Sequence, residues 1–215
     1  MPNYQFHITE GEQTQEVLVG VRRTFTAFFT QRVEYKTGNT YLRPGALLTL
    51  AIDGVNYSVL FLHTKSSSEP IGLGIRDEQF NRALKFKKVL DDAAGETGKA
   101  RYLFLGDLNT MGMKYPFQKQ IDVEFELKKL DQGAKRRKMR RLAKNAPNTW
   151  SNGSGSSFPP SNLDHVVASD NLDFRQFGGA DIDVRGWPEL NTAAHQDKWI
   201  RDFSDHAFLY LEVRK

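Results

Sequence analysis

The chain has 215 residues and a mass of 24.5 kDa, enough to bury one sizeable core or at most two. Its 39% hydrophobic and 26% charged residues are typical of a soluble globular protein, and no apolar stretch approaches the roughly 20 residues that span a bilayer. Because there is no cysteine, disulfides, thiolate metal sites and a cysteine nucleophile are excluded. The first residues have neither a basic start nor an apolar core, so we expect no secretory signal, no membrane association and a cytoplasmic protein.

The formal net charge of +4 is unevenly distributed. Residues 128–144 hold nine Lys or Arg and one Asp, so this segment carries +8 and the rest of the chain carries −4. Such a segment can bind a phosphate backbone independently of sequence, and it can equally be the solvated face of a helix.

In chain order, residues 1–15 are polar and give no structural prediction. Residues 16–35 contain two segments rich in β-branched and aromatic residues, which predict two strands. Residues 47–52 and 57–63 flank Asp53-Gly54, a strong signal for a β-hairpin. The second of these segments is nearly all apolar, which indicates a central strand.

Apolar residues at intervals of three or four predict an amphipathic helix over 74–94, with Gly95 as its C-cap. A strand follows at 101–105, and strand, helix, strand indicates a crossover that packs a helix on the sheet. Residues 124–143 are predicted to be helical, with a break at Gly133.

The composition of residues 146–162 indicates a loop. After it we expect strands at 163–169, 181–185 and 206–213, and a short helix at 188–200. These strands are too few to close a second core, so the whole chain, 1–215, is predicted to be a single domain.

Polar residues stand at the ends of four of the predicted strands. Asp107 and Asn109 follow the strand that ends at Gly106, and residues two apart on an extended chain point to the same side. His63 ends an earlier strand, while Asp164-His165 and Asp205-His206 open later ones. Each group alone is also consistent with an ordinary turn or loop at a strand end. Together, acids, amides and histidines without cysteine suit phosphoryl chemistry with a hard metal ion.

Four segments carry a resemblance to a known family: His63 at the end of YSVLFLHTKS, GDLNT (106–110), SNLDHVVAS (161–169) and FSDHAFLYLEV (203–213). In order and spacing they resemble the later motifs of the endonuclease/exonuclease/phosphatase superfamily, which includes deoxyribonuclease I. The resemblance covers roughly residues 16–215. It implies an α/β protein with a four-layer sandwich, in which two packed mixed β-sheets are flanked by helices.

The resemblance also implies roles for five residues. Asp107 would orient or deprotonate the attacking water, and Asn109 would bond a phosphate oxygen and steady Asp107. His206 would stabilise the negative charge that develops on phosphorus, with Asp164 holding its imidazole. His63 would donate to a non-bridging phosphate oxygen.

A divalent ion, Mg²⁺ or Mn²⁺, is implied as the cofactor, with Asp205 as a carboxylate ligand. The superfamily begins with a strand that carries an asparagine and a second strand that ends in a metal-binding glutamate, and neither is found before Glu16. We therefore expect an N-terminally truncated sandwich in which residues 1–15 are disordered or rearranged. Its exposed strand edges would favour a homodimer.

Two functions remain open. The first is metal-dependent hydrolysis of phosphodiester bonds by in-line attack of water, as in a nuclease; the second is a catalytically impaired protein that binds nucleic acid or self-associates without cleaving. A phosphatase for small or lipid phosphates is a third possibility. Trp150 and Phe158 could stack on bases, and beside a phosphodiesterase site the basic segment favours nucleic acid, DNA or RNA, as the partner. The cations expected to contact it are Lys135, Arg136, Arg137, Lys138, Arg140 and Arg141.

Overall fold

The computed structural model describes residues 3–10, 16–114 and 120–214. Three α-helices are described: α1 (Pro70–Ala93), α2 (Val123–Lys135) and α3 (Ala193–Asp202). Two 3₁₀ turns cover Val33–Lys36 and Trp187–Glu189. The strands in these ranges are β1 (Tyr4–Ile8), β2 (Leu18–Arg22), β3 (Thr26–Arg32), β4 (Gly45–Ile52), β5 (Val55–Phe61), β6 (Arg101–Asp107), β7 (Met139–Arg141), β8 (Asp164–Ser169), β9 (Asp183–Arg185) and β10 (Phe208–Tyr210).

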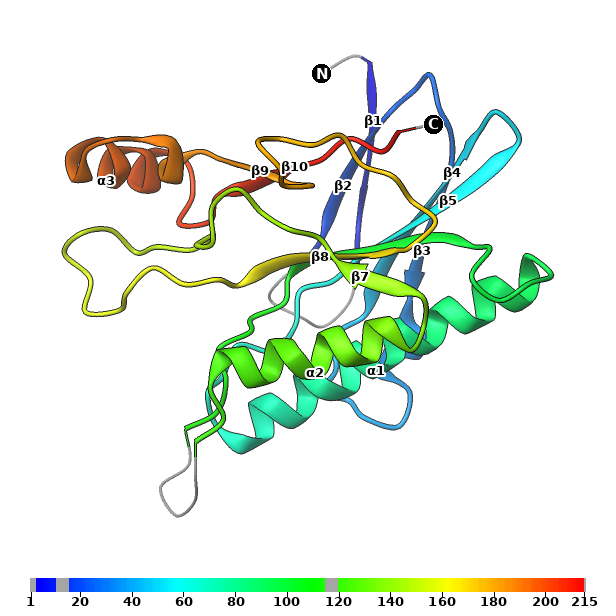
Figure 1. Cartoon of the computed structure of the whole chain (residues 1–215), viewed down its shortest axis with the longest axis horizontal. Coiled ribbons are helices and arrows are strands. Elements are labelled where there is room, and N and C mark those ends of the chain that lie inside the picture. Colours follow the sequence, from blue (N-terminus) through cyan, green and yellow to red (C-terminus); the bar gives the residue numbers. More distant parts are fainter. Residues whose placement is uncertain (1–2, 11–15, 115–119, 215) are drawn as a thin grey trace.

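A six-stranded mixed sheet in the order β3-β4-β5-β6-β8-β7 forms the centre of the molecule (Figure 1). Its only parallel pair is β5 with β6, and α1 is the crossover between them, as the sequence predicts. The predicted hairpin joins β4 and β5, and both turn residues, Asp53 and Gly54, have a positive φ.

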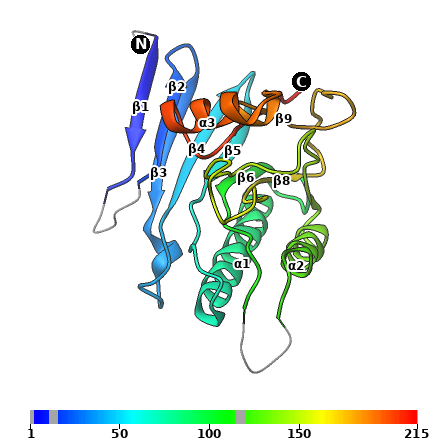
Figure 2. The same ribbon diagram turned by 90° about the vertical axis from the view of Figure 1, so that its left-hand side faces the viewer.

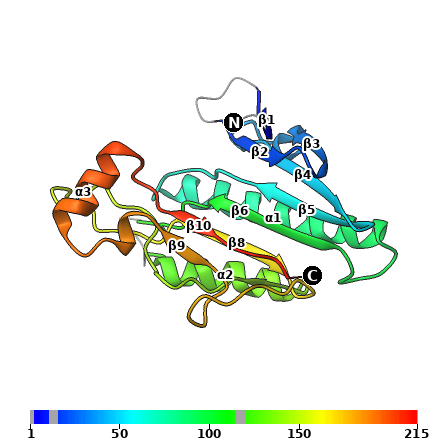
Figure 3. The same ribbon diagram turned by 90° about the horizontal axis from the view of Figure 1, so that it is seen from above.

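The sheet separates two hydrophobic cores. Along β6, Tyr102 and Phe104 pack against α1 and α2, whereas Leu103 packs on the opposite face with residues around β9. The helices α1 and α2 therefore cover one face, and a second β layer, with α3 at its end, covers the other (Figures 2 and 3). This confirms the predicted α/β sandwich of two β layers with helices outside.

The second β layer is divided into two two-stranded sheets, β1-β2 and β9-β10. The β1-β2 hairpin packs Val19 and Val21 over β3 and β4, while β9-β10 lies over the middle of the large sheet. The strand β1 was missed from the sequence, although Tyr4, Phe6 and Ile8 alternate with polar residues. Residues 11–15, part of the segment expected to be disordered, lie outside the described residues.

The prediction of a helix over 124–143 is wrong in its second half. α2 ends at Lys135 without a break at Gly133, the chain turns through Lys138 in the left-handed region (φ 53°), and β7 pairs with β8. The backbone of residues 139–141 pairs with β8 instead, and Met139 reaches the core from that strand. Elsewhere boundaries shift: α1 starts at Pro70, and α3 begins at Ala193, after the N-cap Thr192.

None of the helices in the described ranges is both long enough and apolar enough to cross a membrane.

Candidate functional site

The polar strand ends predicted from the sequence meet at one end of the large sheet. Asp107 is the last residue of β6 and lies opposite Asp164, the first residue of β8. His63 follows β5 by two residues, and backbone bonds from Leu62 and Thr64 to β6 hold it beside Asp107. His206 precedes β10 and is bonded to Asp164. Segments far apart in the sequence thus supply one cluster.

Gly106 is the residue that allows this approach. It has φ +135°, a conformation that residues with a side chain rarely adopt, and a Cβ at this position would lie 2.0 Å from the Leu62 carbonyl oxygen. The backbones before His63 and Asp107 can therefore touch only because residue 106 is glycine.

Asp107 stands at the centre of the cluster. Its Oδ1 accepts from the backbone N–H of Asn109 (3.0 Å) and its Oδ2 from the Asn109 side-chain amide (2.8 Å). The Nε2 atoms of His63 and His206 lie 3.4 Å and 3.9 Å from Oδ2. Two imidazole rings therefore converge on one carboxylate oxygen. The three side chains are 17–29% exposed, which leaves them accessible to a ligand.

Asn109 has only part of the role that the resemblance implies. Its side-chain amide donates to Asp107 and to the Thr64 carbonyl oxygen (3.2 Å), so both amide hydrogens are used inside the protein. Asn109 is also buried and has φ +48°. It steadies Asp107, but in this arrangement it has no hydrogen left to donate to a phosphate oxygen.

Asp164 orients His206, since its Oδ2 lies 2.9 Å from His206 Nδ1. That contact leaves Nε2 directed toward Asp107. Asp164 is itself fixed, because its backbone N–H donates to the hydroxyl of Thr149, a fully buried residue that sequence reasoning missed.

The environment sets different charges on the three central groups. Burial, together with the charge of Asp164, raises the pKa of Asp107 to about 6. Burial disfavours the charged form of His206, but its hydrogen bond to Asp164 and the charges of Asp164 and Asp107 outweigh this and raise its pKa to about 9. Burial and the charge of Arg43, which donates to the His63 carbonyl oxygen, lower the pKa of His63 to about 4. Near neutral pH the site therefore holds a carboxylate, an imidazolium and a neutral imidazole.

Comparison with solved structures identifies the architecture. Truncated TDP2 from Caenorhabditis elegans matches with a TM-score of 0.62 at 15% identity, covering 100% of this chain and 76% of that chain. TDP2 from D. rerio, complexed with single strand DNA product, matches at 0.59 with 13% identity, covering 100% and 78%. A mannosyl-6-phosphatase from Bacteroides thetaiotaomicron matches at 0.55 with 16% identity and the same coverage. This chain has the deoxyribonuclease I-like fold.

At these identities the likeness shows the fold alone. Neither a family model nor a curated protein sequence matches the chain. The chain also spans only 58% of a longer C. elegans TDP2 chain.

A buried ion pair secures the loops that carry the site. Arg76 of α1 is fully buried and bonds both oxygens of Glu126 of α2, at 2.6 Å and 3.1 Å. It also donates to the carbonyls of Lys65, Ser67 and Gly112, which lie in the loops after His63 and after Asn109. Sequence reasoning missed this pair, although an arginine beside Ile75 on the apolar face of a predicted helix was a signal for it.

The metal ligands that the resemblance implies are not assembled in this deoxyribonuclease I-like chain. Among residues 3–10, 16–114 and 120–214, no group of three His, Asp or Glu side chains could hold a metal ion. Asp205, the predicted ligand, is exposed, and its Oδ2 accepts from the Trp150 indole (2.9 Å). These residues do not fit a complete site for a divalent ion.

Lys144, the last residue of the basic segment, donates to the backbone carbonyl oxygen of Asp164 (2.7 Å), but the six cations predicted to bind nucleic acid lie farther from the site. Asp164 and Ser169 are the two ends of β8; Asp107 lies opposite the first and Met139 opposite the second. At about 3.4 Å per residue, the two ends are about 17 Å apart. Proximity to the site therefore gives no reason to assign these cations to nucleic acid, contrary to the argument from sequence.

The six cations predicted to bind nucleic acid also differ in how many contacts they make within the protein. Arg141 makes a bidentate ion pair with Asp131, and Arg140 donates to the carbonyls of Ser169 and Leu172. Both stabilise the local fold. Lys135, Arg136 and Lys138 are exposed and Arg137 is half-buried, so the free cations lie around the C-terminus of α2.

Proposed function

We propose that this protein hydrolyses phosphate esters by in-line attack of water, and that its substrate is a phosphodiester of a nucleic acid strand. The observation that carries the proposal is the convergence of His63 and His206 on one oxygen of Asp107. A base, a cation and a neutral donor around one point are what a phosphoryl transfer requires.

The charges give each group one task. Asp107, with a pKa of about 6, is ionised at neutral pH and takes a proton from water as the water oxygen bonds to phosphorus. His206, with a pKa of about 9, supplies a positive N–H for the negative charge that develops on the phosphoryl oxygens while the bond to the leaving oxygen breaks. Neutral His63 donates to a second phosphoryl oxygen. Asn109 and Asp164 position Asp107 and His206.

A cavity of about 540 Å³ beside Asp205 could receive the remainder of the substrate. Its walls come from residues 152–155, from Arg201 of α3 and from Ser204. The exposed Phe158 lies in the same 151–160 loop and offers a surface for stacking on a base, whereas Trp150 is anchored to Asp205. The D. rerio TDP2 structure with its single strand DNA product supports a nucleic acid substrate, and the mannosyl-6-phosphatase supports a monoester.

The test is nicking of supercoiled DNA by the purified protein, with Mg²⁺, with Mn²⁺ and with chelator. We expect Asp107→Asn to lower the rate by about 10²–10⁴-fold, because the general base is lost. The control Lys88→Glu changes an exposed cation that pairs only with Asp92 on the surface, and should leave the rate unchanged. Cleavage that persists at the full rate in Asp107→Asn would refute the proposal.

One observation favours the second function, binding without cleavage: the described residues assemble no three-ligand metal group. Retained DNA binding with no cleavage at any concentration of Mg²⁺ or Mn²⁺ would support it. Dependence on either ion stays a prediction from the sequence.

We also propose that the chain self-associates through its second β layer. β1-β2 and β9-β10 are separate two-stranded sheets, and Phe6, Ile8 and Leu18 on the hairpin are at least half exposed. Residues 143–145 bond to the edge of β9, so the β1-β2 hairpin with its exposed apolar side chains is the part that favours pairing with another chain.

A further inference from the structure

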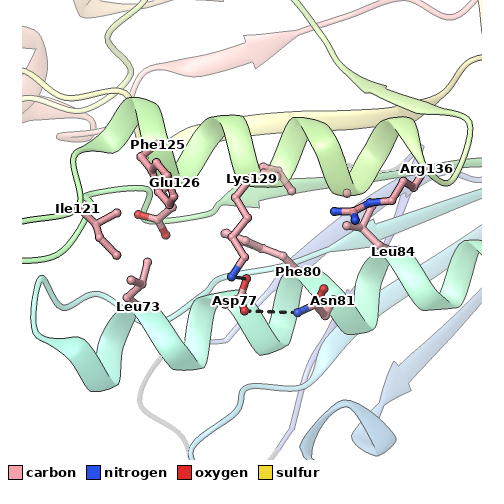
Figure 4. A pocket seen from close by; sticks show the side chains of 12 residues that line it. Leu73, Asp77, Phe80, Asn81, Leu84, Ile121, Phe125, Glu126, Lys129 and Arg136 are labelled. Carbon is pink, nitrogen blue, oxygen red and sulfur yellow. Dashed lines mark hydrogen bonds and ion pairs between the residues drawn. The ribbon is translucent and has the colours of Figure 1, made fainter.

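A groove runs between α1 and α2, away from the candidate site (Figure 4). Its floor is apolar and comes from both helices: Leu73, Phe80 and Leu84 of α1, and Leu130 of α2. The enclosed part has a volume of about 90 Å³. Phe125, in the first turn of α2, stands at its rim with 58% of its surface exposed.

Gly133 lets the two helices approach at the far end of this groove. A Cβ at this position would lie 2.7 Å from Leu84 Cδ1. Beyond this contact the groove widens into an open cavity of about 580 Å³, which Lys85, Arg136 and Arg137 line. The apolar floor therefore continues directly into a cationic end.

The cations at this end have no carboxylate partner among the described residues, unlike two others on the same helices. Lys129, midway along the groove, pairs with Asp77 at 2.8 Å, and Lys88 pairs with Asp92 at 2.7 Å. Within the described residues, no ion pair with a carboxylate is found for Lys85, Arg136 or Arg137. Arg136 donates only to the carbonyl of Gln132. Because the residues outside 128–144 together carry −4, this positive end is a distinct surface.

We propose that the α1–α2 groove is the docking site for an acidic amphipathic helical segment of a partner protein. Apolar side chains of the segment would pack on Leu73 and on the exposed Phe125 at the rim, and its carboxylates would pair with the cations beyond Gly133. Residues 73–84 span about 16 Å of helix, so three turns of a partner helix lying across the groove would match its length. A nucleic acid backbone would leave the apolar floor unused, and its regular phosphates would meet cations at one end only.

The test uses a fluorescently labelled synthetic peptide of about 15 residues, with leucines at helical spacing along one face and glutamates in the last turn. We expect it to bind the intact protein with an affinity that falls as salt rises. The double variant Lys85→Glu, Arg137→Glu should weaken binding at least tenfold, and Phe125→Ala should also weaken it. The matched controls Lys88→Glu and Lys128→Glu lie on the same helices outside the groove and should change it less than twofold.

Two outcomes would overturn the proposal. In the first, the peptide does not bind, or a peptide with its leucines scrambled binds equally well, so that the apolar floor has no part. In the second, a DNA duplex competes through Lys85 and Arg137 while Phe125→Ala has no effect, which assigns the cationic end to nucleic acid. Circular dichroism of each variant excludes unfolding as the cause of lost binding, and an unchanged nicking rate shows that the groove is independent of the proposed active site.

Discussion

The proposed mechanism requires opposite protonation states of two neighbouring groups, Asp107 and His206. The base requires Asp107 ionised, which holds above its pKa of about 6, and charge stabilisation requires His206 protonated, which holds below its pKa of about 9. Activity should therefore rise through pH 6 and fall through pH 9. Initial rates of phosphodiester cleavage from pH 5 to 10 measure both limbs; a rate that stays constant across this range would contradict the assigned roles.

The pH at which activity falls on the alkaline side of the profile depends on Asp164. In Asp164→Asn the hydrogen bond and the negative charge that raise the pKa of His206 are both lost or weakened, so burial is less opposed. We expect the upper limb to move from about 9 toward the ordinary value of 6.5 and the maximal rate to fall. The lower limb should not rise, because the charge of Asp164 contributes to the high pKa of Asp107. An upper limb that stays at 9 would show that His206 is not the titrating acid.

At this scale the sequence was informative where motifs stand at strand ends. His63, Asp107, Asn109, Asp164 and His206 stand at the ends of apolar strands and are singled out by the resemblance of these segments to known motifs, and the structure brings all five together. The partners of these residues, such as Thr149 and Thr64, could not be found, because a hydroxyl that bonds a backbone group carries no sequence signal. The full engagement of the Asn109 amide likewise depends on a carbonyl 45 positions away.

At the scale of the elements, Gly106 joins β6 to the loop of the site. Gly106→Ala should cost at least about 3 kcal/mol, because a Cβ meets the Leu62 carbonyl oxygen in addition to the strain of positive φ. The matched control is Gly54→Ala in the β4–β5 turn, where φ is +77° and nothing lies within 4 Å of the Cβ. We expect about 1–2 kcal/mol there. Urea unfolding of both variants gives the comparison; equal losses would show that the contact with Leu62 is not restrictive.

The Arg76–Glu126 pair links α1 and α2 to both site loops. Arg76→Met leaves Glu126 buried without its partner, so the free energy of unfolding should fall by about 3–5 kcal/mol. The double variant Arg76→Met, Glu126→Leu should lose less than the sum of the two single variants, because no unpaired charge remains. Urea unfolding again measures the effect. Strict additivity would contradict the coupling.

The sequence predicted α1 and the β4–β5 hairpin well, because periodicity and turn residues decide these elements locally. It failed for residues 136–143, where Met139 and Leu142 continue the helical spacing of α2. Met139 instead reaches the core from β7, which pairs with β8. Pairing with a distant strand outweighed the local periodicity, and no signal within the segment reveals it.

At the scale of the whole molecule, the deoxyribonuclease I-like sandwich has an undivided sheet on one side and a divided layer on the other. If the β1-β2 hairpin pairs between copies, the protein should sediment as a dimer as concentration rises from micromolar to submillimolar. Replacing Phe6 and Leu18, both exposed, with Lys should shift it toward monomer. A single monomeric species at all concentrations would rule out this mode of association.

NMR titration of the histidine side chains tests most directly whether His63, His206 and Asp107 interact in one site. The signals are assigned with His63→Gln and His206→Gln. We expect His206 to titrate near pH 9 and His63 near pH 4, and we expect the pKa of His206 to fall in Asp107→Asn, because the Asp107 carboxylate helps to hold its proton. Two histidines that titrate independently near 6.5, with no response to Asp107→Asn, would contradict the account.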